Sequence, residues 1–293
     1  MITRKIRIGD GIGYAFVYAM TALAFVPVIA FLIYVTAKGI GRINWEFLAT
    51  ASSSMESGGI FAPLFGTLLL TVVSLAFAVP ISLLAAVYLS EYARKDRWFQ
   101  IIELTIVNLA GVPSVVYGLF GLGLFVIFFG LGKSIIAGAL TMACMSLPLL
   151  VTVFYQALKA VPMTLREASL ALGASKLATT FKIVVPTALP GIFTGVILAT
   201  ARIAGETAPV LFTVAAYYMP NLPQSLGDQS MLLSYHLYVI STQNTGVKDE
   251  QKFAVTLVLV MLVLVVNLVA IWARSRAASA LATFACARLT LTS

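Results

Sequence analysis

Two charged residues, Arg202 and Glu206, stand inside an otherwise apolar stretch that runs from Ile183 to Tyr217. Charges in such a stretch are costly and are functional by default. The Arg guanidinium presents five donors in a fork that matches a tetrahedral oxyanion. Glu repels an anion unless that anion still carries a proton to donate. Phosphate carries such a proton at neutral pH and sulfate does not, so the pair favours phosphate as a solute in transit.

A purely structural role is the alternative for this pair. Residues at i and i+4 share a helical face and can neutralise each other, but Arg before Glu is the weaker order. A buried ion pair also adds no stability that two leucines would not supply. We therefore expect Arg202 and Glu206 to line a substrate pathway. If their helix enters the bilayer near Ile192, Arg202 lies about 15 Å deep, at the midplane.

A second candidate site is the polar segment 159–182. Pro162 opens it, and Thr164 is expected to cap a short helix, with Glu167 completing a capping box. Gly173 is expected to end that helix. One face of the helix then carries small and apolar side chains that let another backbone approach: Ala168, Ala171 and Leu172. The alternative is an amphipathic connector that lies on the lipid surface.

The composition indicates which elements position these residues. Of 293 residues, 60% are hydrophobic and 10% are charged, and the mean hydropathy is +1.01. A soluble domain has about 25% charged residues, so soluble, disordered and nucleic-acid-binding classes are excluded. Cys144, Cys286 and the one histidine, His236 in a predicted loop, provide neither a disulfide framework nor a metal cluster. We expect no catalytic residue, no metal and no cofactor bound by this chain.

About 20 apolar residues span a bilayer core of roughly 30 Å. The sequence therefore predicts an all-α integral membrane fold with six transmembrane helices, at Tyr14–Thr36, Pro63–Ser90, Leu104–Gly132, Ser134–Leu158, Ile183–Tyr217 and Phe253–Trp272. We divide the chain into a tail, first span and external loop (1–62), a five-helix core (63–272) and a C-terminal tail (273–293). Most Lys and Arg residues fall in one alternate set of loops, which places both termini in the cytoplasm. The other set holds Lys38, Arg42, Lys133, Lys248 and Lys252.

The third predicted span is unusual because it carries Pro113 and several glycines, among them Gly111, Gly118 and Gly121. Glycines let helices pack closely, and proline interrupts the backbone hydrogen bonds. One interpretation is a closely packed helix. The other is a kinked or broken helix that lines a pathway.

The polar segment resembles the EAA loop of ABC importer permeases. The matching residues are Glu167, Ala168, Gly173, Ile183 and Pro186, whereas Ser169 replaces the second Ala and Val185 replaces Leu. The resemblance implies a type I ABC importer permease core. It also implies that the short helix is a cytoplasmic coupling helix, whose ATPase-coupling residues are Thr164, Glu167, Ala168 and Gly173.

The segment 201–209 is similar to the Arg-x-x-Gly-Glu-Thr-Ala-Pro segment of phosphate permeases of the PstA family, and so are segments 108–119 and 162–175. The resemblance covers roughly Leu64 to Trp272. It implies that Arg202 and Glu206 take part in phosphate passage in a bacterial or archaeal inner membrane. It also implies three partners: a homologous PstC-like permease subunit, a PstB-like ATPase dimer that binds ATP-Mg, and an external PstS-like phosphate-binding protein.

Other functions fit the residues less well. Gly130–Ser134 looks like the end of a Walker A loop, but Ile127 stands where that motif needs Gly, so we expect a separate ATPase. A secondary transporter needs more titratable groups in its spans and two repeat halves. An intramembrane enzyme needs a Ser/His or paired-Asp arrangement. Within the importer interpretation, molybdate or sulfate is the alternative substrate.

Overall fold

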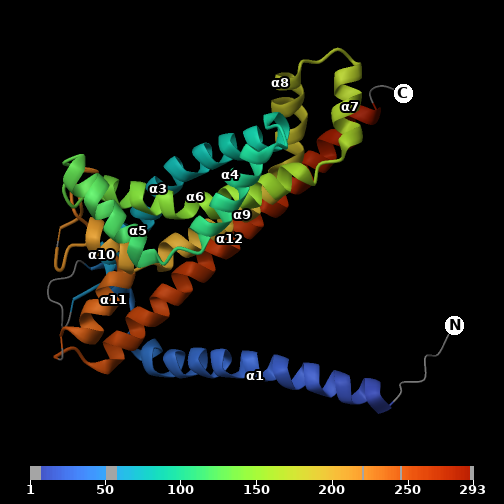
Figure 1. The fold of residues 1–293 in the computed structure, drawn as a ribbon. Helices are drawn as coiled ribbons and strands as arrows, with labels where there is room; N and C mark the ends of the chain where they lie inside the picture. Colours follow the sequence, from blue (N-terminus) through green and yellow to red (C-terminus); the bar gives the residue numbers. More distant parts are fainter. Residues whose placement is uncertain (1–7, 51–57, 220, 245, 291–293) are drawn as a thin grey trace.

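The computed structural model describes residues 8–50, 58–219, 221–244 and 246–290. Within these ranges the chain is almost entirely helical, as predicted (Figure 1). Its long helices are α1 (Ile8–Gly39), α3 (Phe61–Val87), α6 (Ile135–Lys159), α9 (Val185–Gly205) and α12 (Asp249–Thr290). Shorter helices and helical turns connect them: η1 (Ile40–Arg42), α2 (Trp45–Ala49), η2 (Tyr88–Tyr92), α4 (Arg97–Ala110), α5 (Ser114–Gly121), η3 (Leu122–Phe128), α7 (Met163–Ala171), α8 (Lys176–Thr179), η4 (Thr180–Val184), α10 (Ala208–Thr213) and α11 (Leu233–Thr242).

Five stretches of the described chain are long and apolar enough to cross a bilayer: Gly13–Arg42, Phe61–Tyr92, Ile135–Lys159, Lys176–Gly205 and Asp249–Val269. The α4–α5–η3 segment passes the same test as two helices that meet at a bend of 99°. Counted as one span, this pair completes the six membrane helices that the sequence predicts. Two predicted spans are not continuous, because Leu104–Gly132 is broken near Pro113 and Ile183–Tyr217 is interrupted after Gly205.

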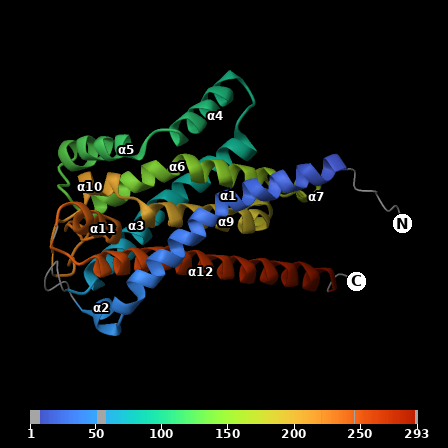
Figure 2. The same cartoon turned by 90° about the horizontal axis from the view of Figure 1, so that it is seen from below.

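Helix α6 occupies the centre of the bundle, and α3 and α9 pack on it (Figure 2). In its most apolar stretch 67% of the residues are buried inside the protein, against 22% in α12 and none in α1. Helix α1 diverges from the bundle (Figure 1) and meets it through α12, where the Tyr34 and Phe253 rings pack edge-on with centroids 5.4 Å apart. Because α9 packs on the central helix α6, α6 positions Arg202 near the end of α9.

The break between α4 and α5 lies at residues 111–113. Proline has a fixed φ and no N–H to donate, so Pro113 ends the hydrogen bonding of α4 and lets α5 start in a new direction. The Tyr117 hydroxyl donates to the Leu109 carbonyl at 2.9 Å, and the Val112 N–H donates to the same carbonyl at 3.2 Å, so Tyr117 fastens α5 to the end of α4. A Cβ on Gly121 would collide with the Thr141 side chain of α6. The predicted broken helix and the predicted close packing are thus both present.

The loop between α10 and α11 covers the start of α6. The first N–H groups of a helix have no partner within it. Here the Ile135 N–H donates to the Asp228 carbonyl at 2.9 Å, and the Ser134 N–H donates to the Thr213 carbonyl of α10 at 3.0 Å. These bonds fix α10 and its following loop against the central helix.

Candidate functional site

Arg202 lies in the last turn of α9, and Glu206 is the residue that follows the helix end. The helical run that contains Arg202 starts at Lys176. Glu206 has φ −74° and ψ 140°, an extended conformation, so the prediction that both residues share a helical face is wrong. The helix ends here because Pro209 has no N–H for the Gly205 carbonyl and its ring would clash with it.

The two charged side chains nevertheless lie together. Arg202 Nε is 3.6 Å from Glu206 Oε1, and the side chains are 31% and 19% exposed. This separation is longer than an ordinary N–H···O hydrogen bond of about 2.7–3.2 Å. The guanidinium makes no hydrogen bond with any residue of the described ranges, so its donors remain available to another group. The backbone at Glu206 is fixed, because the Glu206 carbonyl accepts a hydrogen bond from Ser234 Oγ of α11 at 2.7 Å.

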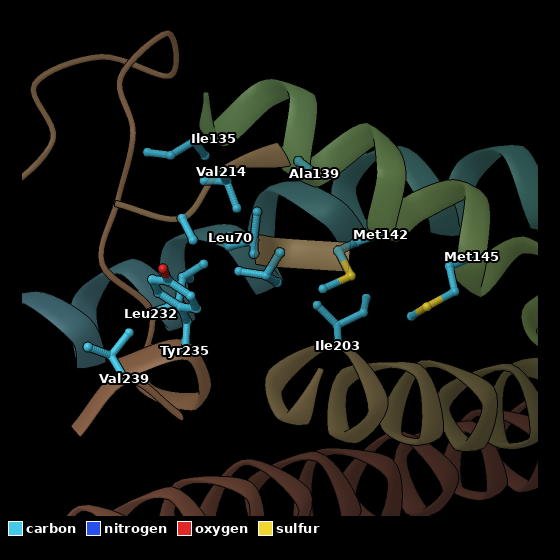
Figure 3. Close-up of a cluster of buried hydrophobic side chains, with 12 residues drawn as sticks. Leu70, Ile135, Ala139, Met142, Met145, Ile203, Val214, Leu232, Tyr235 and Val239 are labelled. Atoms are coloured by element: carbon cyan, nitrogen blue, oxygen red, sulfur yellow. The ribbon is translucent and has the colours of Figure 1, made fainter. Parts of the chain in front are cut away.

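The level of this pair along the bundle follows from the packing of its neighbour Ile203. Ile203 belongs to a buried cluster that includes Met142 and Met145 of α6 (Figure 3). At 1.5 Å per residue, these methionines lie about 10 and 15 Å along α6 from its start at Ile135. Arg202 therefore lies level with the interior of the central helix and away from its end.

Two helix breaks meet beside the charged pair. Helix α5, which follows the first break, packs on α10, which follows the second. A Cβ on Gly118 would lie 2.8 Å from Pro209 Cα and 2.8 Å from Phe212 Cδ2. A Cβ this close would force the neighbouring backbone to shift, so glycine at position 118 is what lets α5 approach the segment that carries Glu206.

Sequence reasoning missed Tyr117, which lies on α5 beside this contact. It is close enough to Arg202 for the guanidinium charge to act on its hydroxyl. Its position next to the glycines of a proline-broken helix was the available signal, and a weak one. The candidate pathway site therefore consists of Arg202 and Glu206, with Tyr117 as a polar neighbour.

The second candidate site, α7, lies at the opposite end of the bundle from α10 (Figures 1 and 2). The helix starts at Met163, and its N-cap is Pro162, with no side-chain cap. Thr164 is therefore inside the first turn, and the predicted capping box with Glu167 is wrong. Pro162 takes the N-cap position because its extended ψ of 138° leaves its carbonyl free to accept the Leu165 N–H at 3.3 Å.

The end of α7 agrees with the prediction. The helix stops at Ala171, and Gly173 has a φ of +85°, a left-handed conformation that glycine adopts without strain. Glu167 and Ala168 are exposed, as is Thr164, and Leu172 is 89% exposed. One side of α7 thus presents small and apolar residues away from the bundle.

The other side of α7 is tied to the bundle by side chains that sequence reasoning missed. Arg166 and Glu91 of η2 form a bidentate ion pair, with Nε–Oε2 at 3.1 Å and Nη2–Oε1 at 2.9 Å. The hydroxyls of Ser169 and Thr179 are 2.8 Å apart. A usable signal for Glu91 was its place as the first charge after the apolar run 63–90.

His236 lies in a buried helix, α11, where we expected a loop. Burial lowers its pKa from 6.5 to about 4, so the imidazole is neutral at physiological pH. Its Nδ1 has no partner among the described residues. Within the described part of the chain, no three His, Cys, Asp or Glu side chains come together as a metal ion would need.

Comparison with known proteins relates this arrangement to a family. Residues 78–281 match the model of the family described as "Binding-protein-dependent transport system inner membrane component". The chain is 35% identical to phosphate transport system permease protein PstA 1 of Mycobacterium tuberculosis, over 89% of this chain and 86% of that protein. It is 35% identical to the probable ABC transporter permease protein YqgI of Bacillus subtilis, over 82% and 86%. It is 30% identical to the probable PstA of Methanocaldococcus jannaschii, over 83% and 85%.

Solved structures of ABC transporters share the fold. A bacterial alginate ABC transporter has a TM-score of 0.67 at 14% identity, over 89% of this chain and 93% of that chain. The inward-facing MetNI methionine ABC transporter has a TM-score of 0.60 at 18% identity, over 73% and 94%. The predicted importer-permease fold is thereby confirmed. The chain belongs to the binding-protein-dependent transport system inner membrane component family, as a multi-pass ABC transporter permease related to the PstA proteins.

Proposed function

We propose that this chain is the permease subunit of an ATP-driven importer of inorganic phosphate and forms half of its translocation pathway. The observation that carries the proposal is the similarity, over most of the chain, to proteins named as PstA phosphate transport permeases. The charged pair at the end of α9 supports the same substrate.

The chemistry of the pair explains a preference for phosphate. Arg202 donates hydrogen bonds to phosphate oxygens, and Glu206 accepts a hydrogen bond from the P–OH group that phosphate still carries at neutral pH. The separation of 3.6 Å between Nε and Oε1 leaves both side chains able to exchange their partner for the anion. Sulfate has no proton to donate and meets the Glu206 carboxylate as a like charge. Tyr117 lies beside the pair, on the helix that Gly118 brings close to α10.

The remaining assembly is part of the proposal. A PstC-like permease supplies the other half of the pathway, a PstB-like ATPase dimer binds and hydrolyses ATP-Mg, and a PstS-like protein delivers phosphate from outside. Helix α7 and the turn that follows it dock on the ATPase through four exposed residues: Thr164, Glu167, Ala168 and Gly173. Both termini then lie in the cytoplasm, and residues 63–272 form the permease core. Motion of α7 opens the spans alternately to each side of the membrane.

Radiolabelled phosphate uptake tests this proposal in cells that lack their own phosphate importers. The chain is expressed with PstC, PstB and PstS partners, and each partner is omitted in turn. We expect uptake that needs ATP and every partner and that persists with excess sulfate or molybdate. If the complete assembly transports one of those oxyanions and not phosphate, the substrate assignment is wrong. If uptake follows an ion gradient and needs no ATPase, the importer assignment is wrong.

A further inference from the structure

Arg166 and Glu167 are neighbours on α7, but their side chains enter opposite environments. Glu167 is exposed, whereas the side chains of Arg166 and its partner Glu91 are 11% and 9% exposed. Both carboxylate oxygens of Glu91 accept from the guanidinium, at 3.1 and 2.9 Å. A bidentate pair of this kind fixes the orientation of the two side chains as well as their distance.

The same guanidinium also closes the end of α6. Nη2 of Arg166 donates to the Leu158 carbonyl at 2.8 Å, and Nη1 donates to the Val161 carbonyl. The Leu158 carbonyl also accepts the Val161 N–H at 3.2 Å, so Arg166 adds a second donor there and holds the end of α6 together with the turn that follows it. One side chain on α7 therefore joins the end of α6 and, through Glu91, the end of α3.

Glu91 is also held from the side of α3. Ser90 Oγ donates to its Oε1 at 2.9 Å, and the Lys176 ammonium, which lies 4.9 Å from the Tyr92 ring centroid, adds favourable charge. The η2 turn that carries Glu91 continues α3 within one membrane-spanning stretch, Phe61–Tyr92. A displacement of Glu91 is therefore a displacement of the end of a span.

We propose that Glu91 and Arg166 form a positioning pair that transmits the displacement of α7 to α3 and α6. The proposal rests on the proposed function in one respect, namely that the ATPase moves α7. The Ser169–Thr179 contact ties α7 to the helical run that leads into α9. The Glu91–Arg166 pair joins α7 to the ends of α3 and α6. The exposed side of α7 receives the motion, and the buried side passes it on.

The test follows a single reporter cysteine in the complex assembled with its permease and ATPase partners. Cys144 and Cys286 are replaced by serine, and Gly205→Cys places the reporter beside the charged pair, where a Cβ meets nothing within 4 Å. The rate of labelling by a hydrophilic maleimide is measured with and without a non-hydrolysable ATP analogue. This readout needs no phosphate, so it separates failure of the pair from failure of the substrate assignment.

We expect the analogue to change the labelling rate in the parent complex. The change should be lost in Glu91→Gln and in Arg166→Gln, while the ATPase still co-purifies and hydrolyses ATP. The double variant should lose no more than the worse single variant, because the two side chains act as a unit. Arg166→Lys keeps the charge without the fork and should restore part of the change. Asp249→Asn, which breaks the Lys252–Asp249 pair at the start of α12, is the matched control and should keep the full change.

Three results would overturn the proposal. The first is an undiminished labelling change in Glu91→Gln. The second is a variant in which the yield of assembled complex and the labelling change fall by the same factor, because that result indicates a purely structural role. The third is no change with the analogue in the parent. If Arg166→Gln does not assemble, Glu91→Gln decides alone, because it keeps the side-chain shape and leaves Arg166 bonded to α6.

Discussion

The contact between α5 and α10 predicts different effects for two Gly→Ala substitutions in the same broken span. At Gly118 the added Cβ would lie 2.8 Å from Pro209 Cα, a backbone atom that cannot rotate away, whereas at Gly123 it would meet nothing within 4 Å. Both changes gain roughly 0.8–1 kcal/mol of helix propensity. Overpacking at Gly118 costs about 1–3 kcal/mol. Gly118→Ala should therefore be about 1–3 kcal/mol less stable than Gly123→Ala.

Denaturation of the two purified variants by SDS in detergent micelles measures this difference directly. Because α10 begins two residues after Glu206, Gly118→Ala should also reduce phosphate uptake, while Gly123→Ala should resemble the wild type. Equal stability and equal uptake of the two variants would show that the close approach of α5 to α10 places no constraint on the site.

Three further predictions concern other parts of the chain. Gly173→Val forces a φ of +85° on a β-branched residue, which costs about 1–2 kcal/mol. This variant and Glu167→Arg should both uncouple ATP hydrolysis from phosphate uptake. Normal uptake by either variant would contradict the docking role of that residue. Burial holds the pKa of His236 near 4 in the folded protein, so the unfolded chain takes up a proton at this residue first as the pH falls below 6.5. The free energy of unfolding of the wild type should therefore fall by up to ~3 kcal/mol between pH 6.5 and pH 4. Denaturation curves at these two pH values should show a smaller fall for His236→Gln. Thr164→Ala should change stability by under about 0.5 kcal/mol, against the ~1 kcal/mol expected of a true N-cap.

Apolar run length predicted the spans well because a bilayer imposes one minimum length on every crossing. Pro63–Ser90 and Ser134–Leu158 fall close to the observed helices for this reason. Gly173 was predictable for a local reason as well, since the left-handed residue that ends a helix is usually glycine.

The missed features depend on choices between local alternatives or on distant contacts. Thr164 and Pro162 are both acceptable at a helix start, and the backbone uses Pro162. The end of α9 at Gly205 follows from Pro209, a local helix-breaking signal that the length of an apolar run does not register. Glu91 and Arg166 are 75 residues apart in the sequence, so their pairing appears when α3 and α6 pack and has no spacing to reveal it.

Phosphate uptake by pathway variants tests whether Arg202 and Glu206 handle the transported anion. Wild type, Arg202→Gln and Glu206→Gln are compared in the complete assembly, with Lys252→Gln as a charge-removing control outside the pathway. We expect uptake to collapse in both pathway variants at unchanged protein levels, while the control transports normally. Undiminished uptake in both pathway variants would show that phosphate does not need the charged pair at the end of α9, which would then be a structural feature.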